Sequence, residues 1–363
     1  MKYTKDELCL IWLDSFMGLE YKHKKDLYEH IVKSPKIRTA LESLRDIIER
    51  AISKTAYELL LNSATDEYLS ELLSGLERRG ITCVTIYSKD YPKALENVEI
   101  PPLVLYAVGD VSLLNKSLFS IVGSRKSLPQ SIALAKEYTI SLAEKGEILV
   151  TGSAEGIDEV VLRTCLDNGY KVISVVAGGI LNVYPSKNKS LIDLVAKSGL
   201  VISEYPPEVK PMPYFFPVRN RIIAGLSKGV LIVSGAKDSG ALYTAEYAGE
   251  YGKDIFAIPY NVGIKSGEGC NELIKKGAIL TTEPKDIIEY YGLIKEETEK
   301  PLKEELNEDE IKILEILSGG ETHVEIIAKG LNKPTYVLIP LLSVLEIKGL
   351  IYKNGANFYG RVK

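Results

Sequence analysis

Residues 118–152, LFSIVGSRKSLPQSIALAKEYTISLAEKGEILVTG, contain the pattern that decides the fold. Two short, continuously apolar runs, at 119–122 and 148–150, flank an amphipathic helical segment from Ser131 to Lys145, and each run leads into a glycine turn. Short runs that are apolar at every position are typical of strands buried on both faces, and a helix between two of them predicts a parallel βαβ unit.

The same alternation continues in both directions from this unit. Further apolar runs are LVLYAVG from Leu103, KVISVVAGG from Lys171, LVISE from Leu200, VLIVSG from Val230 and IFAIP from Ile255. Helical stretches separate most of them. The sequence therefore predicts an α/β fold with an extended Rossmann-like parallel sheet over residues 77–294.

The residues before this region predict helices only. Thr4 and Glu7 form a capping-box pattern, and a stripe of leucines at helical spacing ends near Gly80: Leu69, Leu72, Leu73 and Leu76. We expect a small helical, SAM-like domain over residues 1–76.

The residues after the sheet region predict a linker and a third domain. Residues 295–305 are charged and lack a periodic pattern, so they favour a linker. In residues 306–363 we expect three helices, with a capping box at Thr322 and Glu325, followed by a type I′ hairpin at Asn354-Gly355. This order predicts a winged helix.

Composition and charge limit the function classes. The 363 residues are 45% hydrophobic and 26% charged, which is typical of a folded protein, and neither a membrane span nor a signal peptide is recognised, so we expect a cytoplasmic protein. A net charge of −4 excludes attraction of the whole molecule to nucleic acid, so any DNA site must be local.

Cysteine and histidine usage argues against metal and nucleophile chemistry. The four cysteines form no CxxC pair and are expected to be buried free thiols, and the three histidines lie near the chain ends. We therefore expect no metal site, no cofactor and no catalytic residues in the central domain.

Two glycine turns after predicted strands are candidate anion sites. The first is Gly123-Ser124-Arg125, where backbone amides and a guanidinium can donate, and the second is TGSAEGID at 151–158, with Gly152, Ser153 and Gly156. Neither matches GxGxxG or the Walker pattern, so neither a dinucleotide nor ATP is indicated. Each turn by itself could equally serve only to connect a strand to a helix.

A third segment, FFPVRNRIIAGLS from Phe215, is more informative. It puts Arg219, Asn220 and Arg221 at the opening of an apolar helix, where cations oppose the macrodipole and an anionic partner would explain them. The alternative is a solvated pair or an ion pair with an acid such as Glu204. The nearby rings can stack on bases, although most of them, Phe216 especially, could equally be core, and we expect only one or two to touch a base: Tyr184, Tyr205, Tyr214, Phe215 and Phe216.

A collinear series of segments resembles the DNA processing protein A (DprA/Smf) family. The segments are LERRGITCVTIYSKDYPKAL from Leu76, PPLVLYAVGDVSLL from Pro101, IVGSR, TGSAEGID, YPSKN from Tyr184, SEYPP from Ser203, FPVRNRIIAGLS, SGALYTA from Ser239, IFAIP, and GCNELIKKGA from Gly269. The resemblance implies a homodimer that binds single-stranded DNA without hydrolysing it, protects incoming strands and hands them to the RecA recombinase in natural transformation.

The same resemblance implies the residues that contact DNA: Gly123, Ser124, Arg125, Gly152, Ser153, Gly156, Lys187, Asn188, Arg219, Asn220, Arg221, Lys237, Ser239 and Gly240. Three positions depart from the family pattern. Asp238 stands where many members have a basic residue, Leu162 where a histidine is frequent, and Tyr260 where glycine is usual. Asp238 is expected to weaken strand binding or to shift the contact.

Other functions remain open. The alternative is a nucleotide-binding Rossmann-like enzyme or sensor, similar to phosphoribohydrolases; their PGGxGTxxE signature is missing, but Glu246 remains as an acid. A scaffold that recruits partners through its helical ends would leave the arginine-rich segment unexplained. The third helix of the last domain is mostly apolar and contains Pro340, with Lys333 and Lys348 near its ends, which favours a protein-contact or regulatory module over duplex reading.

Overall fold

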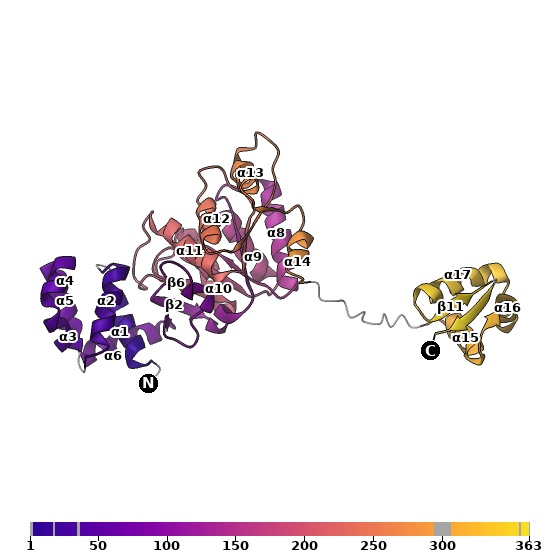
Figure 1. Cartoon of the computed structure of the whole chain (residues 1–363), viewed down its shortest axis with the longest axis horizontal. Helices are drawn as coiled ribbons and strands as arrows, with labels where there is room; N and C mark the ends of the chain where they lie inside the picture. Colours follow the sequence, from indigo (N-terminus) through magenta and orange to yellow (C-terminus); the bar gives the residue numbers. More distant parts are fainter. Residues whose placement is uncertain (1–2, 17–18, 35–36, 294–305, 356, 363) are drawn as a thin grey trace. The chain divides into compact units, whose positions relative to one another are not determined.

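The computed structural model describes residues 3–16, 19–34, 37–293, 306–355 and 357–362. The chain forms two compact units, residues 1–294 and 295–363 (Figure 1). The helical and sheet regions that we predicted as separate domains belong to the same unit. The predicted linker at 295–305 lies outside the described residues.

Within the described part of the larger unit, nine strands form one sheet in the order β1-β2-β6-β5-β4-β3-β7-β8-β9. The strands from β6 to β9 in this order pair in parallel, whereas β1 and β2 pair antiparallel at one edge. The predicted parallel sheet is therefore confirmed, with an antiparallel edge added. The bounds are β1 Thr82–Thr85, β2 Val104–Gly109, β3 Leu118–Val122, β4 Ile148–Thr151, β5 Val172–Val175, β6 Leu200–Ser203, β7 Gly229–Ile232, β8 Asp254–Ala257 and β9 Ile279–Leu280.

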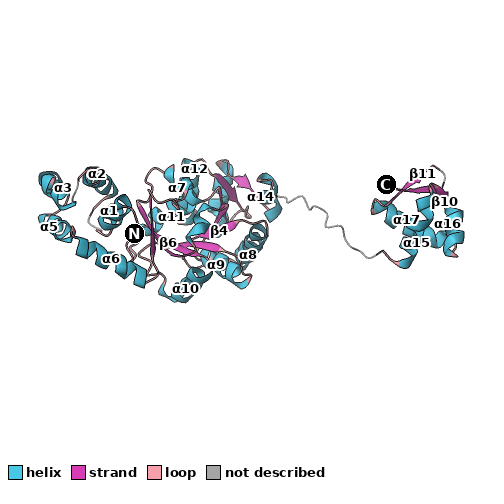
Figure 2. Ribbon diagram, turned by 90° about the horizontal axis from the view of Figure 1, so that it is seen from below, coloured by secondary structure: helices cyan, strands magenta, loops and turns pink. Residues whose placement is uncertain are grey.

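Helices cover both faces of this sheet (Figure 2). One face packs against α8 (Pro129–Glu144), α9 (Ile157–Asp167) and α10 (Lys189–Ser198), and the other against α11 (Phe215–Leu226) and α12 (Ala241–Glu250). Successive strand residues point to opposite faces, so Leu149 belongs to the first core and Val150 to the second. Burial on both faces explains why these strands are mostly apolar, and their few polar side chains, such as Ser120 and Thr151, are buried and hydrogen-bonded.

The chain reverses direction across the sheet at β3. From β3 it proceeds through β4 and β5 to β6 on one side, and α11 then returns it to β7, which pairs with the other side of β3. The loops after β3 and β7 consequently diverge and leave a crevice beyond their carboxyl ends. This switch point is where open α/β sheets bind ligands.

Shorter helices complete the sheet region: α7 (Lys93–Glu96), α13 (Glu268–Lys275) and α14 (Pro284–Tyr290). At the N-terminus the helices are α1 (Lys5–Asp14), α2 (Tyr21–Ile31), α3 (Ile37–Ser43), α4 (Arg45–Ala51), α5 (Lys54–Ser63) and α6 (Asp66–Arg78). The predicted capping box at Thr4 and Glu7 is confirmed, and so is the left-handed glycine at Gly80 after α6. Trp12 is fully buried and donates to the Ser63 hydroxyl at 3.0 Å.

The smaller unit contains α15 (Glu308–Ile316), β10 (Thr322–His323), α16 (Val324–Leu331), α17 (Thr335–Ile347), β11 (Ile351–Asn354) and β12 (Phe358–Arg361). The strands form an antiparallel sheet in the order β10-β12-β11. This is the predicted element order, and the assignment to the winged-helix class stays a prediction.

Two local predictions for the smaller unit are wrong. Thr322 is in a strand, so His323 caps α16 in its place. In the hairpin, Asn354 pairs with Phe358, so three residues separate the strands, where a type I′ turn would have two. Across the described residues, no helix is long and apolar enough to cross a membrane.

Truncating one strand residue should measure how much the covered sheet contributes. Leu149 is fully buried, so Leu149→Ala is expected to lower the free energy of unfolding by about 2–5 kcal/mol. Urea denaturation measures this change. Leu59 is 60% exposed, and Leu59→Ala should change it by less than about 0.5 kcal/mol. Equal losses for the two variants would contradict this account of the core.

Candidate functional site

A cleft of about 640 Å³ lies at the switch point of the sheet. Its walls come from the loop after β3 (122–126), from the start of α11 with the residues before it (213–223), and from the turn that leads into α12 (236–244), with Ala154 and Asp158 of the turn after β4 and with Ser266. Of the predicted contact residues, those that border it are Gly123, Ser124, Arg125, Arg219, Asn220, Ser239 and Gly240. The fold therefore brings segments that are distant in sequence to one cleft.

Arg125 is the exposed cation of this cleft. Its guanidinium carbon lies 5.0 Å from the centroid of the Phe216 ring, close enough for a cation–π contact. Among the residues that the structure describes, no carboxylate forms an ion pair with it. The charge of Arg125 is therefore available to a ligand.

The backbone of the same loop offers fewer donors than we expected. The amide of Ser124 donates to the Ser234 hydroxyl at 3.3 Å, and the amide of Lys126 donates to the Ser124 hydroxyl at 3.1 Å. These two donors are used within the protein. The side chains of Arg125 and Lys126, both exposed, are left as the main donors of this loop.

The aromatic rings of this region lie partly in the core and partly at the cleft. Phe216 is half-buried and borders the cleft, whereas Phe215 is buried and stacks on Tyr205 with 4.0 Å between ring centroids. Of the two alternatives left open for Phe216, a core residue or a ring at the cleft, the structure therefore favours the second. Tyr184 is 54% exposed and meets Phe216 edge-on, with 5.8 Å between centroids.

The second glycine turn supports the first loop from behind. Gly156 has φ +81°, and a Cβ there would lie 2.3 Å from the Ser124 carbonyl oxygen. Ser153 is buried, and its hydroxyl donates to the Tyr184 carbonyl at 3.4 Å. Gly152, Ser153 and Gly156 do not border the cleft, so close packing accounts for them.

Arg219 forms the floor of the cleft. It is buried, donates from Nη1 to the Val175 carbonyl and from Nε to Asn220 Oδ1 at 3.1 Å. A Cβ on Gly152 would lie 2.2 Å from Asp158 Oδ2 and 2.6 Å from both Nη atoms of Arg219, so the two charged groups lie side by side. Burial lowers the pKa of Arg219 to about 10, opposed by Asp158, and burial raises the pKa of Asp158, opposed by Arg219.

The position of Arg221 differs from the prediction. We expected it in the same cleft, but it is buried elsewhere, and its Nη2 pairs with the Glu204 carboxylate. Burial raises the pKa of Glu204, and the charge of Arg221 opposes this rise. The alternative that we left open, an ion pair with Glu204, is the one observed. The arginines also lie in the second turn of α11, because the helix begins at Phe215.

The remaining predicted cations lie outside the cleft lining. Lys187 pairs with Glu155 at 3.1 Å and Lys237 with Glu272 at 2.9 Å, and all four side chains are exposed. Asn188 is buried and donates to the Ser153 carbonyl at 3.1 Å. Asp238 borders the cleft and is exposed.

The acid that the enzyme interpretation named lies outside the cleft, although the carboxylates of Asp158 and Asp238 border it. Glu246 is exposed on α12 and is not among the lining residues. The four cysteines are buried and free, as expected, and burial raises the pKa of Cys165 and Cys270 to about 12. Within the described ranges, no cluster of His, Cys, Asp or Glu could hold a metal ion.

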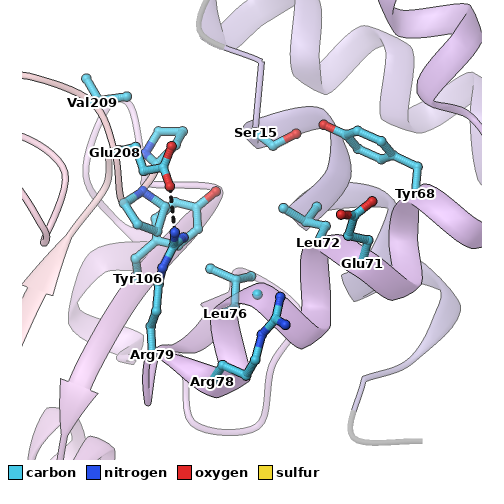
Figure 3. Close-up of a pocket in the computed structure, with 13 residues that line it drawn as sticks. Ser15, Tyr68, Glu71, Leu72, Leu76, Arg78, Arg79, Tyr106, Glu208 and Val209 are labelled. Atoms are coloured by element: carbon cyan, nitrogen blue, oxygen red, sulfur yellow. Dashed lines mark ion pairs between the residues drawn. The ribbon is translucent and has the colours of Figure 1, made fainter.

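A second hollow, of about 500 Å³, lies between α6 and residues 206–209 (Figure 3). Arg78 and Arg79 line it together with Glu71 and Glu208, and Arg79 pairs with Glu208 at 2.9 Å. Because acids accompany both cations, this hollow has no excess of positive charge. Nothing in the sequence indicated it, since α6 and residues 206–209 meet only in the folded chain.

The parallel sheet and the cleft at its switch point define a Rossmann-like ligand-binding domain. Comparison with known proteins agrees with this fold and also identifies the family. The chain belongs to the family described as DNA recombination-mediator protein A, whose profile matches residues 82–292. It is 37% identical to DNA processing protein DprA of Bacillus subtilis, over 70% of this chain and 84% of that one, and 34% identical to protein Smf of Escherichia coli, over 77% of each.

Solved structures of the family have the same fold. DNA processing protein A from Streptococcus pneumoniae aligns with a TM-score of 0.66 and 30% identity, over 80% of this chain and 98% of that one. DNA processing protein A from Helicobacter pylori, reported for its single-stranded DNA binding mode, aligns with a TM-score of 0.53 and 30% identity, over 58% of this chain and 95% of that one.

Because the Arg221–Glu204 pair is buried, we expect substitution of Arg221 to lower stability much more than substitution of an exposed arginine. Arg221→Met leaves the Glu204 carboxylate buried without its cation and should lower the free energy of unfolding by about 3–5 kcal/mol. Arg163 is exposed and pairs with Glu159 at 2.9 Å, so Arg163→Met should cost less than about 1 kcal/mol. Urea denaturation at neutral pH checks both values. Adding Glu204→Gln to Arg221→Met should recover part of the loss, and no recovery would contradict the pairing.

Proposed function

We propose that this protein binds single-stranded DNA in the switch-point cleft and breaks no bond in it. The observation that carries the proposal is the exposed guanidinium of Arg125, which has no acidic partner among the described residues and lies over the Phe216 ring at the cleft. A free cation next to an aromatic surface matches a ligand that alternates phosphates with bases.

The cleft combines charge with stacking. Arg125 and Lys126 are exposed cations for phosphates, and the exposed ring of Tyr184, beside Phe216, is a surface on which a base can stack. The helix α12 begins at the cleft edge, since Gly240 and Ala241 border it, and the N-terminal end of a helix attracts anions. Neither feature distinguishes one base from another, so these contacts would tolerate any sequence.

Arg219 and Asp158 have a different role in this proposal. Arg219 is buried, and its donors are directed to Val175 and Asn220, so it positions the walls of the cleft and does not grip a phosphate. The Nδ2 of Asn220 in turn donates to the Gly240 carbonyl at 3.0 Å, which connects α11 to the start of α12. The contacts to DNA would then come from the exposed rim.

The biological role that we propose is inferred from the family to which the chain belongs. Relatives at 34–37% identity are named DprA and Smf, and the Helicobacter pylori protein was studied for its single-stranded DNA binding. On this basis we propose that the chain acts in the cytoplasm as a homodimer, protects incoming strands and hands them to the RecA recombinase during transformation or recombination. A hydrolase of the phosphoribohydrolase kind is disfavoured, because Glu246 lies outside the cleft.

Fluorescence anisotropy with a labelled oligo-dT strand tests the proposal. Across a salt series, the log–log slope should be about −0.7 for each neutralised phosphate, and a duplex of the same length should bind more weakly. Arg125→Ala should weaken binding and flatten the slope by roughly one contact. Arg163→Ala removes an exposed arginine that does not border the cleft and should leave the slope unchanged.

Two results would overturn the proposal. One is hydrolysis of nucleoside monophosphates by a protein that fails to bind oligo-dT, which would favour the enzyme alternative. The other is the same salt slope for Arg125→Ala and for the unaltered protein.

A further inference from the structure

Asp238 is a carboxylate in a cleft that we propose for a polyanion. It is exposed and borders the cleft together with Ser239 and Gly240. Its neighbour Lys237 is held by Glu272 at 2.9 Å, and none of the cations in the described ranges forms an ion pair with Asp238. The negative charge therefore faces whatever enters the cleft.

The chemistry of a DNA strand restricts what this carboxylate can contact. Phosphates repel it, and the deoxyribose within a strand has no hydrogen-bond donor. The bases are the only part of the strand with N–H groups, so a favourable contact with Asp238 must be made by a base. Guanine alone presents two adjacent donors, N1–H and the 2-amino group, which match the two oxygens of a carboxylate.

A second polar group in the same cleft is unsatisfied. Thr244 is 1% exposed and borders the cleft, and its Oγ1 has no hydrogen-bond partner in the protein. A threonine in a helix commonly bonds the carbonyl four residues earlier, but Thr244 does not bond that of Gly240, which accepts from Asn220 Nδ2 at 3.0 Å. The buried hydroxyl therefore lacks a partner within the protein, and the O6 atom of guanine is an acceptor of the kind that it lacks.

The wall between these polar groups suits a base rather than a phosphate. Ile223 and Ala241 border the cleft beside Thr244 and make this part of its wall apolar, although only 1% of Ile223 and 7% of Ala241 is exposed. A phosphate against this wall would lose hydration without gaining a donor. A base would bury its ring and keep its edge for hydrogen bonds.

We propose that Asp238, together with Thr244, forms a subsite that selects a guanine base within the bound strand. This inference rests on the proposed binding of single-stranded DNA in the same cleft. The carboxylate would accept from N1–H and the 2-amino group of one guanine, while Arg125 and Lys126 hold the phosphates. Binding would then be sequence-tolerant over most of the strand, with a preference at one position.

Single-base replacement in an oligo-dT strand tests this subsite. A strand in which one central dT is replaced by dG should bind roughly five- to tenfold more tightly than oligo-dT in an anisotropy titration at fixed salt, because a good bidentate contact discriminates bases by this order or more. One guanine per strand avoids quadruplex formation. Inosine, which lacks the 2-amino group, should lose most of the gain, and 7-deazaguanine should keep it.

Two variants test whether Asp238 and Thr244 cause the preference for dG. Asp238→Asn keeps the shape of the side chain but removes the charge and one acceptor, so it should abolish the preference for dG and bind oligo-dT at least as tightly as the unaltered protein. Thr244→Val should reduce the preference without abolishing it. Asp167→Asn, which changes an exposed aspartate outside the cleft, is the matched control and should leave the preference intact.

The possible failures are distinguishable. Absence of oligo-dT binding would overturn the proposed function itself. Normal oligo-dT binding with equal affinity for the dG strand, or a dG preference that survives in Asp238→Asn, would overturn the guanine subsite and leave the proposed function standing.

Discussion

The buried guanidinium of Arg219 is the constraint on which the cleft depends. It joins the end of β5 through the Val175 carbonyl, the start of α9 through the neighbouring Asp158, and the start of α12 through Asn220 and the Gly240 carbonyl. A buried charge is tolerated only when such partners surround it, so these segments must keep their relative positions. The exposed groups of the rim are held in place by this buried contact.

The helix α11 connects this site to the N-terminal helices. Arg219 and Arg221 are two residues apart and therefore point about 200° apart around the helix. Arg219 meets the floor of the cleft, whereas Arg221 pairs with Glu204 among tyrosines that include Tyr21 of α2. One helix thus carries two buried arginines that contact different parts of the same compact unit.

Much of the cleft could be predicted, and the misplacement of Arg221 has a simple physical cause. The loop at Gly123 to Arg125 was found because it follows a predicted strand, and the turn at Ser239-Gly240 was found through the family resemblance. Arg221 was misassigned because the arginines were expected to lie at the opening of the helix. It begins at Phe215, with Pro217 in its first turn, where proline is tolerated. Correct placement of that start would have separated the arginines by periodicity alone.

The sequence by itself determined the α/β class, the parallel order of the central strands and the identity of the cleft loops, because continuous apolar runs and glycine turns are local patterns that burial on both faces imposes. The tertiary structure decided which charges are free and which are paired. Arg125 is exposed over Phe216, Arg221 is buried against Glu204, and Asp238 faces the cleft unpaired within the described ranges. Ion pairs form between residues that are distant along the chain, so only the packing of the elements selects the partners.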